Sequence, residues 1–277
     1  MPLHPFAGIA LHTWTLDTTP FPDALRVAKE AGYDAVEVRR LDFTRMFAQG
    51  TSNAAVLDLI RTSGLPVSAL GVEYGWFFAQ GEERQRLFSV FQECCTNAVA
   101  LGCPLLMSAI GPGAVSTEDA IANVRHAADL AAASGLELTL EYQFGHPAVT
   151  SLEILREVIA RADRANVRLL LDAYHLERCG RGGRGFADVP ADAISYAQFS
   201  DVPDAPVPSI PAIDRLPPGH GVARLGDFFS LLAAKDYRGY LSYEAPNPAY
   251  WARPPADVAR EGLAATRAVL AQSFNGA

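Results

Sequence analysis

The sequence lacks the features that mark several large classes of protein. No apolar run among its 277 residues approaches the roughly 20 residues of a membrane-spanning helix, so we expect no membrane partner. The N-terminus, MPLHPFAGIALHTW, has neither a basic start nor a small-residue cleavage site, and it does not resemble a signal peptide. We therefore expect a cytoplasmic protein.

Basic residues are few. The 23 lysines and arginines are outnumbered by 31 aspartates and glutamates, which gives a formal net charge of −8. Proteins that bind nucleic acids usually carry a basic surface, because phosphate contacts dominate their affinity, so we expect no nucleic-acid partner. The densest basic stretch, ERCGRGGRG at 177–185, is glycine-rich and predicts a surface loop, with a contact to a substrate phosphate as the alternative.

Motifs that depend on cysteine or on a phosphate-binding loop are also missing. The four cysteines form no CxxC pair, and we interpret them as reduced thiols, mostly buried as small apolar side chains. The pattern GxxxxGK[ST] does not occur. These absences argue against a thiolate metal site and against P-loop nucleotide binding.

The sequence does contain a regular alternation of short β-rich runs and helical stretches. Hydrophobic residues make up 49% of the chain and charged residues 19%, which is enough for a sizeable core. The runs predicted as strands are 8–14, 35–40, 66–73, 104–110, 136–144, 167–176, 194–201 and 239–245. Several are apolar at nearly every position, which is typical of strands covered on both faces in a parallel sheet.

Helical periodicity fills the intervals between these runs. The expected helices are 21–31, 52–63, 83–101, 117–134, 151–164, 186–192, 225–236 and 255–273. Many end at a glycine just before the next strand. Eight alternating units favour an α/β fold, a single-domain (β/α)8 TIM barrel over residues 1–277. The length of the chain agrees, because that fold typically has ~250 residues. An open sheet is the alternative.

One long irregular segment follows the seventh predicted strand. Residues 202–223 hold six prolines. In a barrel this loop lies at the C-terminal end of the strands, where active sites are built. We therefore expect a functional loop rather than a linker between domains.

Four consecutive predicted strands each carry one oxygen-bearing side chain near their C-terminal end. They are Glu141, Asp172, Gln198 and Glu244. Buried carboxylates that converge repel one another unless they are paired or bound to a metal. Each residue alone could instead pair with an arginine, cap a turn or bond to a loop. Together they predict a site for one divalent ion, Mn²⁺, Mg²⁺ or Co²⁺, with Zn²⁺ as a further option.

The same strands resemble a known family. LTLEYQF, LLLDAYHL, AQFSD and LSYEAPNP are similar to motifs of the xylose isomerase-like TIM-barrel superfamily of sugar isomerases, sugar epimerases and AP endonucleases. The resemblance implies that the four oxygen-bearing residues bind the metal and that His175 contacts the oxygens of the substrate. Ketose 3-epimerases of this superfamily usually have His at the seventh-strand position. Gln198 matches hydroxypyruvate isomerase-like members instead.

A second resemblance lies in the proline-rich loop. IDRLPPGHG is similar to the D-R-x-x-P-G-x-G segment of ketose 3-epimerases, whose arginine binds substrate. This resemblance implies that Arg215 binds substrate and that Gly219 and Gly221 shape the turn. The alternative is that Arg215 is a surface residue.

Other side chains are candidates for the wall of the pocket. Trp14 and Glu37 belong to the first two predicted strands and are expected to line the pocket, together with His12. Trp76 belongs to an aromatic cluster, EYGWFF at 73–78, that could stack on the apolar faces of a sugar and exclude water. A hydrophobic lid or a dimer contact is the alternative for this cluster. Assembly as a homodimer or homotetramer is left open.

These residues predict a metal-dependent isomerase or epimerase of a small sugar or sugar-like hydroxy-carbonyl compound. A divalent ion chelated by a carbonyl and an adjacent hydroxyl acidifies the C–H group between them by stabilising an enediolate. Glu141 and Glu244 can then move the proton while His175 holds an oxygen of the substrate.

Three other functions are known for, or compatible with, barrels that resemble this one. A dehydratase of a cyclic keto-polyol, of the 3-dehydroshikimate or keto-inositol type, begins with the same proton removal. A sugar-binding barrel without catalysis is the second alternative, because a fold does not establish turnover. A DNA-cleaving AP endonuclease is not expected, because the net charge is −8 and the additional histidines that those relatives need on strands two to four are missing.

Overall fold

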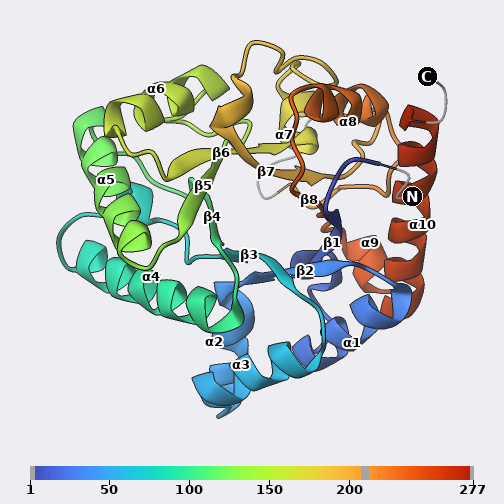
Figure 1. Ribbon diagram of the computed structural model, residues 1–277, viewed down its shortest axis with the longest axis horizontal. Helices are drawn as coiled ribbons and strands as arrows, with labels where there is room; N and C mark the ends of the chain where they lie inside the picture. Colours follow the sequence, from blue (N-terminus) through green and yellow to red (C-terminus); the bar gives the residue numbers. More distant parts are fainter. Residues whose placement is uncertain (1–3, 207–211, 275–277) are drawn as a thin grey trace.

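Eight parallel strands close into a barrel in the computed structural model, which describes residues 4–206 and 212–274 (Figure 1). The strands follow one another in chain order, and β1 pairs with β8 to close the circle. Their bounds are β1 Gly8–His12, β2 Ala35–Arg39, β3 Val67–Gly71, β4 Leu105–Ala109, β5 Glu137–Glu141, β6 Val167–Asp172, β7 Ile194–Phe199 and β8 Tyr240–Tyr243. The predicted TIM barrel is confirmed, and the open sheet is wrong.

Helices connect the strands and form an outer ring (Figure 1). The α-helices are α1 Phe21–Ala31, α2 Arg40–Ala48, α3 Asn53–Thr62, α4 Gly81–Leu101, α5 Thr117–Ala133, α6 Leu152–Ala162, α7 Ala173–Arg178, α8 Leu225–Ala234, α9 Pro248–Trp251 and α10 Pro255–Phe274. Short 3-10 helices are η1 Thr13–Leu16, η2 Trp76–Phe78 and η3 Ala191–Ala193. Within the described ranges, none of these helices has the length and continuous apolar surface that a membrane crossing requires.

Local sequence explains where several outer helices begin and end. Ser52, Ser116 and Ser151 precede α3, α5 and α6, and each hydroxyl accepts a hydrogen bond from a backbone N–H of the first turn. After α1 and α4, Gly32 and Gly102 adopt a left-handed backbone conformation, which glycine tolerates without strain. The helix–glycine–strand pattern of the sequence therefore marks true boundaries.

The sixth unit of the barrel differs from its prediction. The sequence predicts a strand over 167–176, but β6 ends at Asp172 and α7 follows directly. The Asp172 carboxylate accepts a hydrogen bond from the Tyr174 N–H at 2.9 Å, and this cap starts a helix inside the predicted strand. The helix predicted near 186–192 is wrong as well. Turns and η3 replace it, because the glycines of 180–185 disfavour a helix there.

The side chains inside the barrel change from apolar to polar toward the C-terminal ends of the strands. A small apolar cluster inside the barrel consists of Ala69, Leu105, Met107, Leu170 and Tyr196. The larger core fills the space between the strands and the surrounding helices. Most strand positions are fully buried, so apolar packing fixes the sheet while polar side chains gather where the strands end.

Candidate active site

The four predicted ligands lie together at the C-terminal end of the barrel. Glu141 ends β5, Asp172 ends β6, and Gln198 is the last residue but one of β7. Glu244 directly follows β8, and strand pairing places the Cα of Asp172 beside that of Gln198. Each of the four is at most 3% exposed. Barrel closure therefore gathers four buried polar side chains that are far apart in the sequence.

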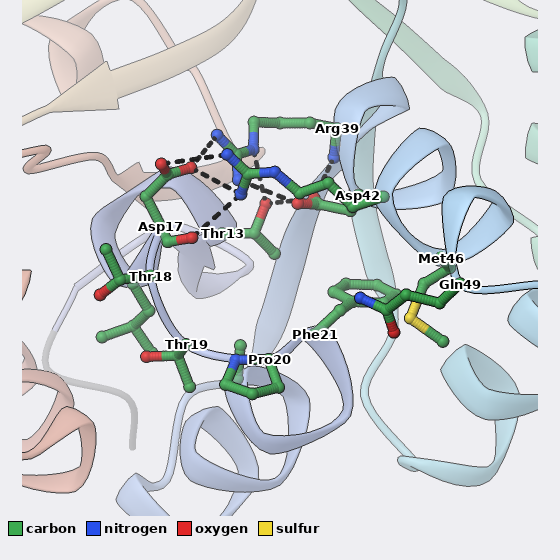
Figure 2. Close-up of a pocket in the computed structure, with 13 residues that line it drawn as sticks. Thr13, Asp17, Thr18, Thr19, Pro20, Phe21, Arg39, Asp42, Met46 and Gln49 are labelled. Carbon is green, nitrogen blue, oxygen red and sulfur yellow. Dashed lines mark hydrogen bonds and ion pairs between the residues drawn. The ribbon is translucent and has the colours of Figure 1, made fainter.

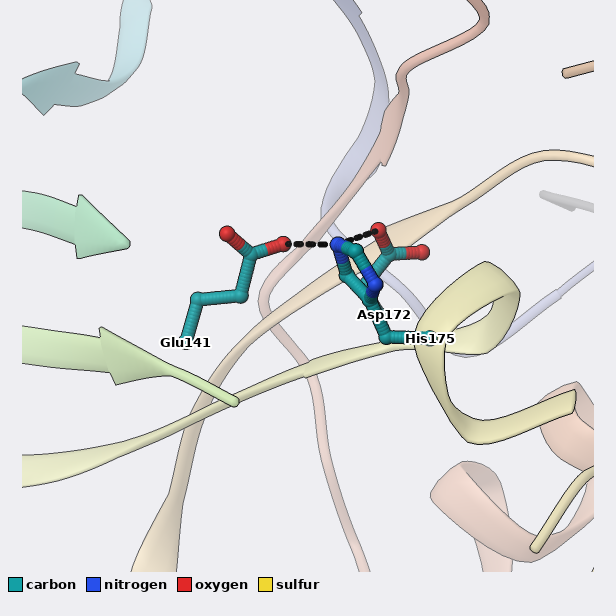
Figure 3. A group of neighbouring side chains, drawn as sticks. All are labelled: Glu141, Asp172 and His175. Atoms are coloured by element: carbon teal, nitrogen blue, oxygen red, sulfur yellow. Dashed lines mark ion pairs between the residues drawn. The ribbon is translucent and has the colours of Figure 1, made fainter. Parts of the chain in front are cut away.

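Glu141, Asp172 and His175 form a compact part of this group (Figure 3). One ligand atom from each residue lies within 4.8 Å of the other two. His175 Nε2 is 3.5 Å from Glu141 Oε1 and 3.7 Å from Asp172 Oδ2. Burial lowers the pKa of His175 to about 3, so the imidazole is neutral at pH 7. Because Asp172 Oδ1 caps α7, Oδ2 is the oxygen directed at the site.

Arg215 places a positive charge between two of the predicted ligands. Its Nη1 donates to Asp172 Oδ2 at 2.7 Å and to Glu244 Oε2 at 2.8 Å, and its Nη2 lies 3.2 Å from His175 Nε2. The guanidinium carbon is 4.3 Å from the centroid of the Tyr174 ring, within range of a cation–π interaction. Arg215 is 2% exposed, so the alternative of a surface residue is wrong.

The proline-rich loop that carries Arg215 is held by hydrogen bonds at that residue and four residues after it. The Asp201 carboxylate, at the start of the loop, accepts a hydrogen bond from the Gly219 N–H at 2.7 Å. Asn247, after β8, donates from Nδ2 to the Arg215 carbonyl at 3.0 Å. Residues 207–211 of the predicted functional loop lie outside the described residues. The described part places Arg215 firmly against the site.

A second polar layer lies behind Gln198 and Glu244. Gln198 Nε2 donates to Glu37 Oε1 at 2.8 Å. His12 Nε2 lies 3.3 Å from Glu244 Oε1 and 3.7 Å from Glu37 Oε1. The backbone N–H of Trp14 donates to His12 Nδ1 at 3.1 Å, so the neutral imidazole carries its proton on Nε2, toward the carboxyl groups. Glu37, predicted to contact substrate, contacts a predicted ligand instead.

Burial and mutual repulsion change how the carboxyl groups titrate. Burial, followed by the charges of Glu244 and Asp172, raises the pKa of Glu141 well above its ordinary value. Burial raises the pKa of Glu244 to about 7, although Arg215 opposes the shift. Burial and the charge of Glu244 raise the pKa of Glu37 to about 8. The site therefore holds carboxyl groups that can gain or lose a proton near neutral pH, as general acid–base catalysis requires.

The donor set fits a divalent cation. Two buried oxygens, Glu141 Oε1 and Gln198 Oε1, have no hydrogen-bond partner among the described residues. Leaving such atoms unpaired costs free energy unless another group binds them. Carboxylate and amide oxygens are the ligands that hard divalent ions prefer, and a bound cation would relieve the repulsion between the carboxylates. These unpaired oxygens support the predicted ligands.

A cavity of about 480 Å³ opens onto this group. Glu141, His175, Arg215 and Glu244 form its polar floor. Loop residues form largely apolar walls, and they include Trp14, Tyr74, Pro112, Phe144, Pro147 and Ala212. The structure thus places Trp14 at the cavity, as predicted. The volume suits a small ligand whose oxygen atoms meet the floor and whose apolar faces meet the walls.

Trp76 does not take the place predicted for it. The side chain is 1% exposed and packs in the core against Phe77, Phe88 and Phe91. Its Nε1 donates to Ser108 Oγ at 2.9 Å. The prediction that Trp76 binds substrate is corrected accordingly: a large apolar ring with a satisfied N–H is stabilised in the core rather than at the mouth.

Tyr74, from the same aromatic cluster, lines the cavity in its place. The loops after β3 and β4 approach closely here, because Gly111 has a φ of +74° and any Cβ would lie 2.6 Å from the Gly75 nitrogen. Tyr74 is 40% exposed overall. Burial of its hydroxyl, followed by the charges of Glu141 and Glu244, raises its pKa well above the ordinary value. Tyr74 thus shares the lining of this cavity with Glu141 and Glu244.

A smaller cavity of about 260 Å³ lies outside the barrel, between η1, α1 and α2 (Figure 2). Arg39 crosses one side of it and donates to Asp17 at 2.9 Å, to Asp42 at 2.9 Å and to Thr13 at 3.1 Å. Each of these charges has a partner, so they offer no free group to a ligand. The network instead ties η1, which carries Trp14, to α2.

Comparison with known proteins identifies the family. Residues 25–269 match the family model described as the xylose isomerase-like TIM barrel. The match covers far more than half of the chain, so the protein belongs to the xylose isomerase-like TIM-barrel family. The resemblance inferred from the strand motifs is confirmed.

Several relatives have known activities or structures. The chain is 28% identical over 254 residues to 3-dehydroshikimate dehydratase of Pseudomonas aeruginosa, covering 87% of this chain but only 38% of that protein. It is 23% identical over 274 residues to inosose isomerase of Halalkalibacterium halodurans, covering 94% of this chain and 95% of the relative. The zinc-bound structure of the IOLI protein superposes with a TM-score of 0.84 at 20% identity, over 96% of this chain and 99% of that one. At this identity the structural likeness supports the fold.

Proposed function

We propose that this protein is a divalent-metal-dependent isomerase or epimerase of a small, sugar-like hydroxy-carbonyl compound. The proposal is carried by two buried carboxyl groups, Glu141 and Glu244, which line one cavity beside ligand oxygens that lack a partner among the described residues. The inosose isomerase relative, which matches over nearly its whole length, supports an isomerase.

Glu141, Asp172, Gln198 and Glu244 would hold the metal. When bound, a divalent ion supplies Lewis acidity, which draws electron density from a carbonyl oxygen and makes the neighbouring C–H group more acidic. The zinc atom in the IOLI structure supports a divalent ion. The oxygen-rich donor set is compatible with Mn²⁺, Mg²⁺, Co²⁺ or Zn²⁺.

The two glutamates would move the proton. One carboxylate removes the hydrogen from a hydroxyl-bearing carbon beside the carbonyl, and the C–H electron pair forms the C=C bond of an enediolate. Return of a proton to the opposite face of the same carbon gives an epimer. Return to the former carbonyl carbon, together with transfer of the hydroxyl proton to the former carbonyl oxygen, gives the aldose–ketose isomer. The raised pKa values of Glu141 and Glu244 support this role, because burial makes each carboxyl hold a proton more firmly than an exposed glutamate does.

His175 and Arg215 would hold oxygens of the substrate. The Phe144 N–H faces His175 Nδ1 at 3.4 Å, and His175 Nε2 lies 3.2 Å from Arg215 Nη2, on the side of Glu141 and Asp172. Arg215 has a buried Nε with no partner among the described residues, so it can donate to a substrate oxygen while Nη1 keeps its two carboxylates. The apolar walls would exclude water from the enediolate.

Deuterium exchange tests the proposal. Mn²⁺-loaded protein is incubated in D₂O with ketohexoses, ketopentoses, hydroxypyruvate, keto-inositol and 3-dehydroshikimate, and NMR follows both the label beside the carbonyl and the product. We expect label and an isomerised product from at least one compound. Glu141→Gln and Glu244→Gln should each lower kcat/KM by about 10²–10⁴, the usual contribution of a positioned acid or base. EDTA should abolish turnover.

The matched control is Glu157→Gln, because Glu157 is 65% exposed on the outer face of α6 and should leave kcat/KM unchanged. A product that has lost water would show a dehydratase and contradict the proposal. If the protein is fully loaded with metal and no compound yields label or product, the proposal is contradicted and the protein is a sugar-binding barrel without catalysis. Retention of most activity in Glu141→Gln would disprove the two-carboxylate scheme.

A further inference from the structure

Gln198 differs from the other three predicted ligands because only one end of its amide can bind a cation. The oxygen is an acceptor, whereas the NH₂ group has two donors and no lone pair to offer. The two ends have nearly the same size, so packing alone does not select one of them. A rotation of the amide by half a turn would direct N–H groups at the metal. A specific partner must hold the productive orientation.

Glu37 is such a partner. Gln198 Nε2 donates to Glu37 Oε1 at 2.8 Å, and Gln198 Oε1 is buried without a partner among the described residues. Glu37 Oε1 accepts this bond, and an acceptor on this side of the amide favours its nitrogen over its oxygen. The free oxygen must then face away from Glu37.

The barrel itself fixes this contact. Glu37 is on β2 and Gln198 is on β7, so β1 and β8 lie between the two strands and the hydrogen bond crosses the interior. Both side chains are completely buried, so water does not compete for either group. Register holds the two backbones in place: Glu37 is paired with His12, and Gln198 with both Asp172 and Ser242.

Glu141 and Glu244 line the cavity, whereas Glu37 Oε1 accepts the hydrogen bond from Gln198 Nε2. The geometry points to Glu37 as a positioning residue that presents the carbonyl oxygen of Gln198 to the metal. The inference rests on the proposed metal site and adds a residue that touches neither metal nor substrate. A histidine at this position of β7 would not have to choose between an oxygen and a nitrogen. The Glu37 acceptor matters because the ligand on β7 is an amide.

Mn²⁺ affinity measured by isothermal titration calorimetry on metal-stripped protein tests this role. Glu37→Leu removes the acceptor and leaves an apolar side chain in the apolar barrel. Its Mn²⁺ affinity should fall about 10–100-fold, the range for losing a partner of a metal ligand. Glu37→Gln is the matched control, because its amide oxygen can still accept the bond from Gln198. Its affinity should stay close to that of the wild type.

A second substitution separates orientation from general damage. Both oxygens of a carboxylate bind a cation, so Gln198→Glu needs no orienting partner. In the Glu37→Leu background, Gln198→Glu should therefore restore most of the lost Mn²⁺ affinity. A double variant that binds as weakly as Glu37→Leu would overturn the positioning role.

The remaining outcomes are also decisive. Wild-type affinity in Glu37→Leu would overturn the role of Glu37 and leave the metal site standing, whereas no Mn²⁺ binding by the wild type would overturn the metal site itself. If circular dichroism shows that Glu37→Leu is unfolded, glutamine-selective ¹⁵N NMR of the Mg²⁺-bound wild type decides. The pair of side-chain amide resonances that disappears in Gln198→Glu is the pair that belongs to Gln198. We expect two widely separated, slowly exchanging amide protons, and shifts equal to those of free glutamine would overturn the inference.

Discussion

At the scale of single residues, the buried charges at the end of the barrel dominate. Glu141, Asp172 and Glu244 are all nearly inaccessible, and Arg215 is the cation that contacts two of them directly. Buried carboxylates without a partner are strongly destabilising. Arg215 therefore has a structural function in addition to its proposed contact with substrate.

Arg215→Met should destabilise the metal-free protein by about 3–5 kcal/mol, because it leaves Asp172 and Glu244 without their buried partner. Urea denaturation in EDTA measures this change in the free energy of unfolding. Arg26→Met is the control, since Arg26 forms only exposed pairs on α1 and should change stability by less than about 1 kcal/mol. Equal, small effects of the two substitutions would contradict the structural function of Arg215.

Some of these residues were predictable one by one and others were not. Asp172 and Glu244 interrupt apolar strand sequences, and that local signal identifies them. Arg215 was identified by a loop motif, yet its ion pairs depend on how the loop folds over the barrel. The bond between Gln198 and Glu37 leaves no local signal, because it joins strands that are not neighbours.

At the scale of elements, two short segments departed from the sequence pattern. The helix α7 starts inside a predicted strand, because Asp172 caps it, and this early start brings His175 to the site. In the segment after β3, Tyr74 lies at the cavity and Trp76 lies in the core. Composition predicted an aromatic cluster there. It could not tell which ring faces which side, because a 3-10 turn follows no long periodic pattern.

Two matched substitutions test this division of roles. Trp76→Phe should reduce the free energy of unfolding by about 1–3 kcal/mol, because Ser108 loses a buried hydrogen bond and the core loses volume. It should leave kcat/KM nearly unchanged. Tyr74→Phe should lower kcat/KM and leave stability nearly unchanged, because it removes only the hydroxyl of a side chain that lines the cavity. Thermal unfolding and steady-state kinetics of both variants measure this, and the reverse pattern would contradict the assignment.

At the scale of the whole molecule, the barrel separates stability from chemistry. Apolar residues fill the interior and the layer under the helices, and this packing stabilises strands whose ends carry buried carboxyl groups. The site is therefore held at a cost in stability that the remainder of the fold offsets. That cost depends on pH, because the carboxyl groups of the site titrate abnormally.

The metal-free protein should lose stability as pH rises from 6.5 to 8. The pKa values of Glu37 and Glu244 are raised to about 8 and about 7, so the folded state binds protons that the unfolded chain has released, and stability falls as pH increases. The lowered pKa values of His12 and His175 act in the opposite direction, and this effect fades as pH rises above their ordinary value of 6.5. Calorimetry in EDTA should show a Tm that decreases across this interval.

Glu37→Gln provides the control for this pH dependence. It removes one of the titrating groups, so the slope of Tm against pH should become smaller. A Tm that is constant or rises between pH 6.5 and 8 in the wild type would contradict the raised pKa values.

The sequence by itself determined the repeating β and α units, the closed barrel and the polar side chains at the ends of strands five to eight. These features follow from local periodicity and from where polar residues interrupt apolar runs. Only the tertiary structure decided that Arg215 is buried between carboxylates, that Tyr74 rather than Trp76 lines the cavity, and that Gln198 donates a hydrogen bond to Glu37. Each of these contacts joins segments distant in the chain, and their geometry exists only once the barrel has closed and its loops have packed.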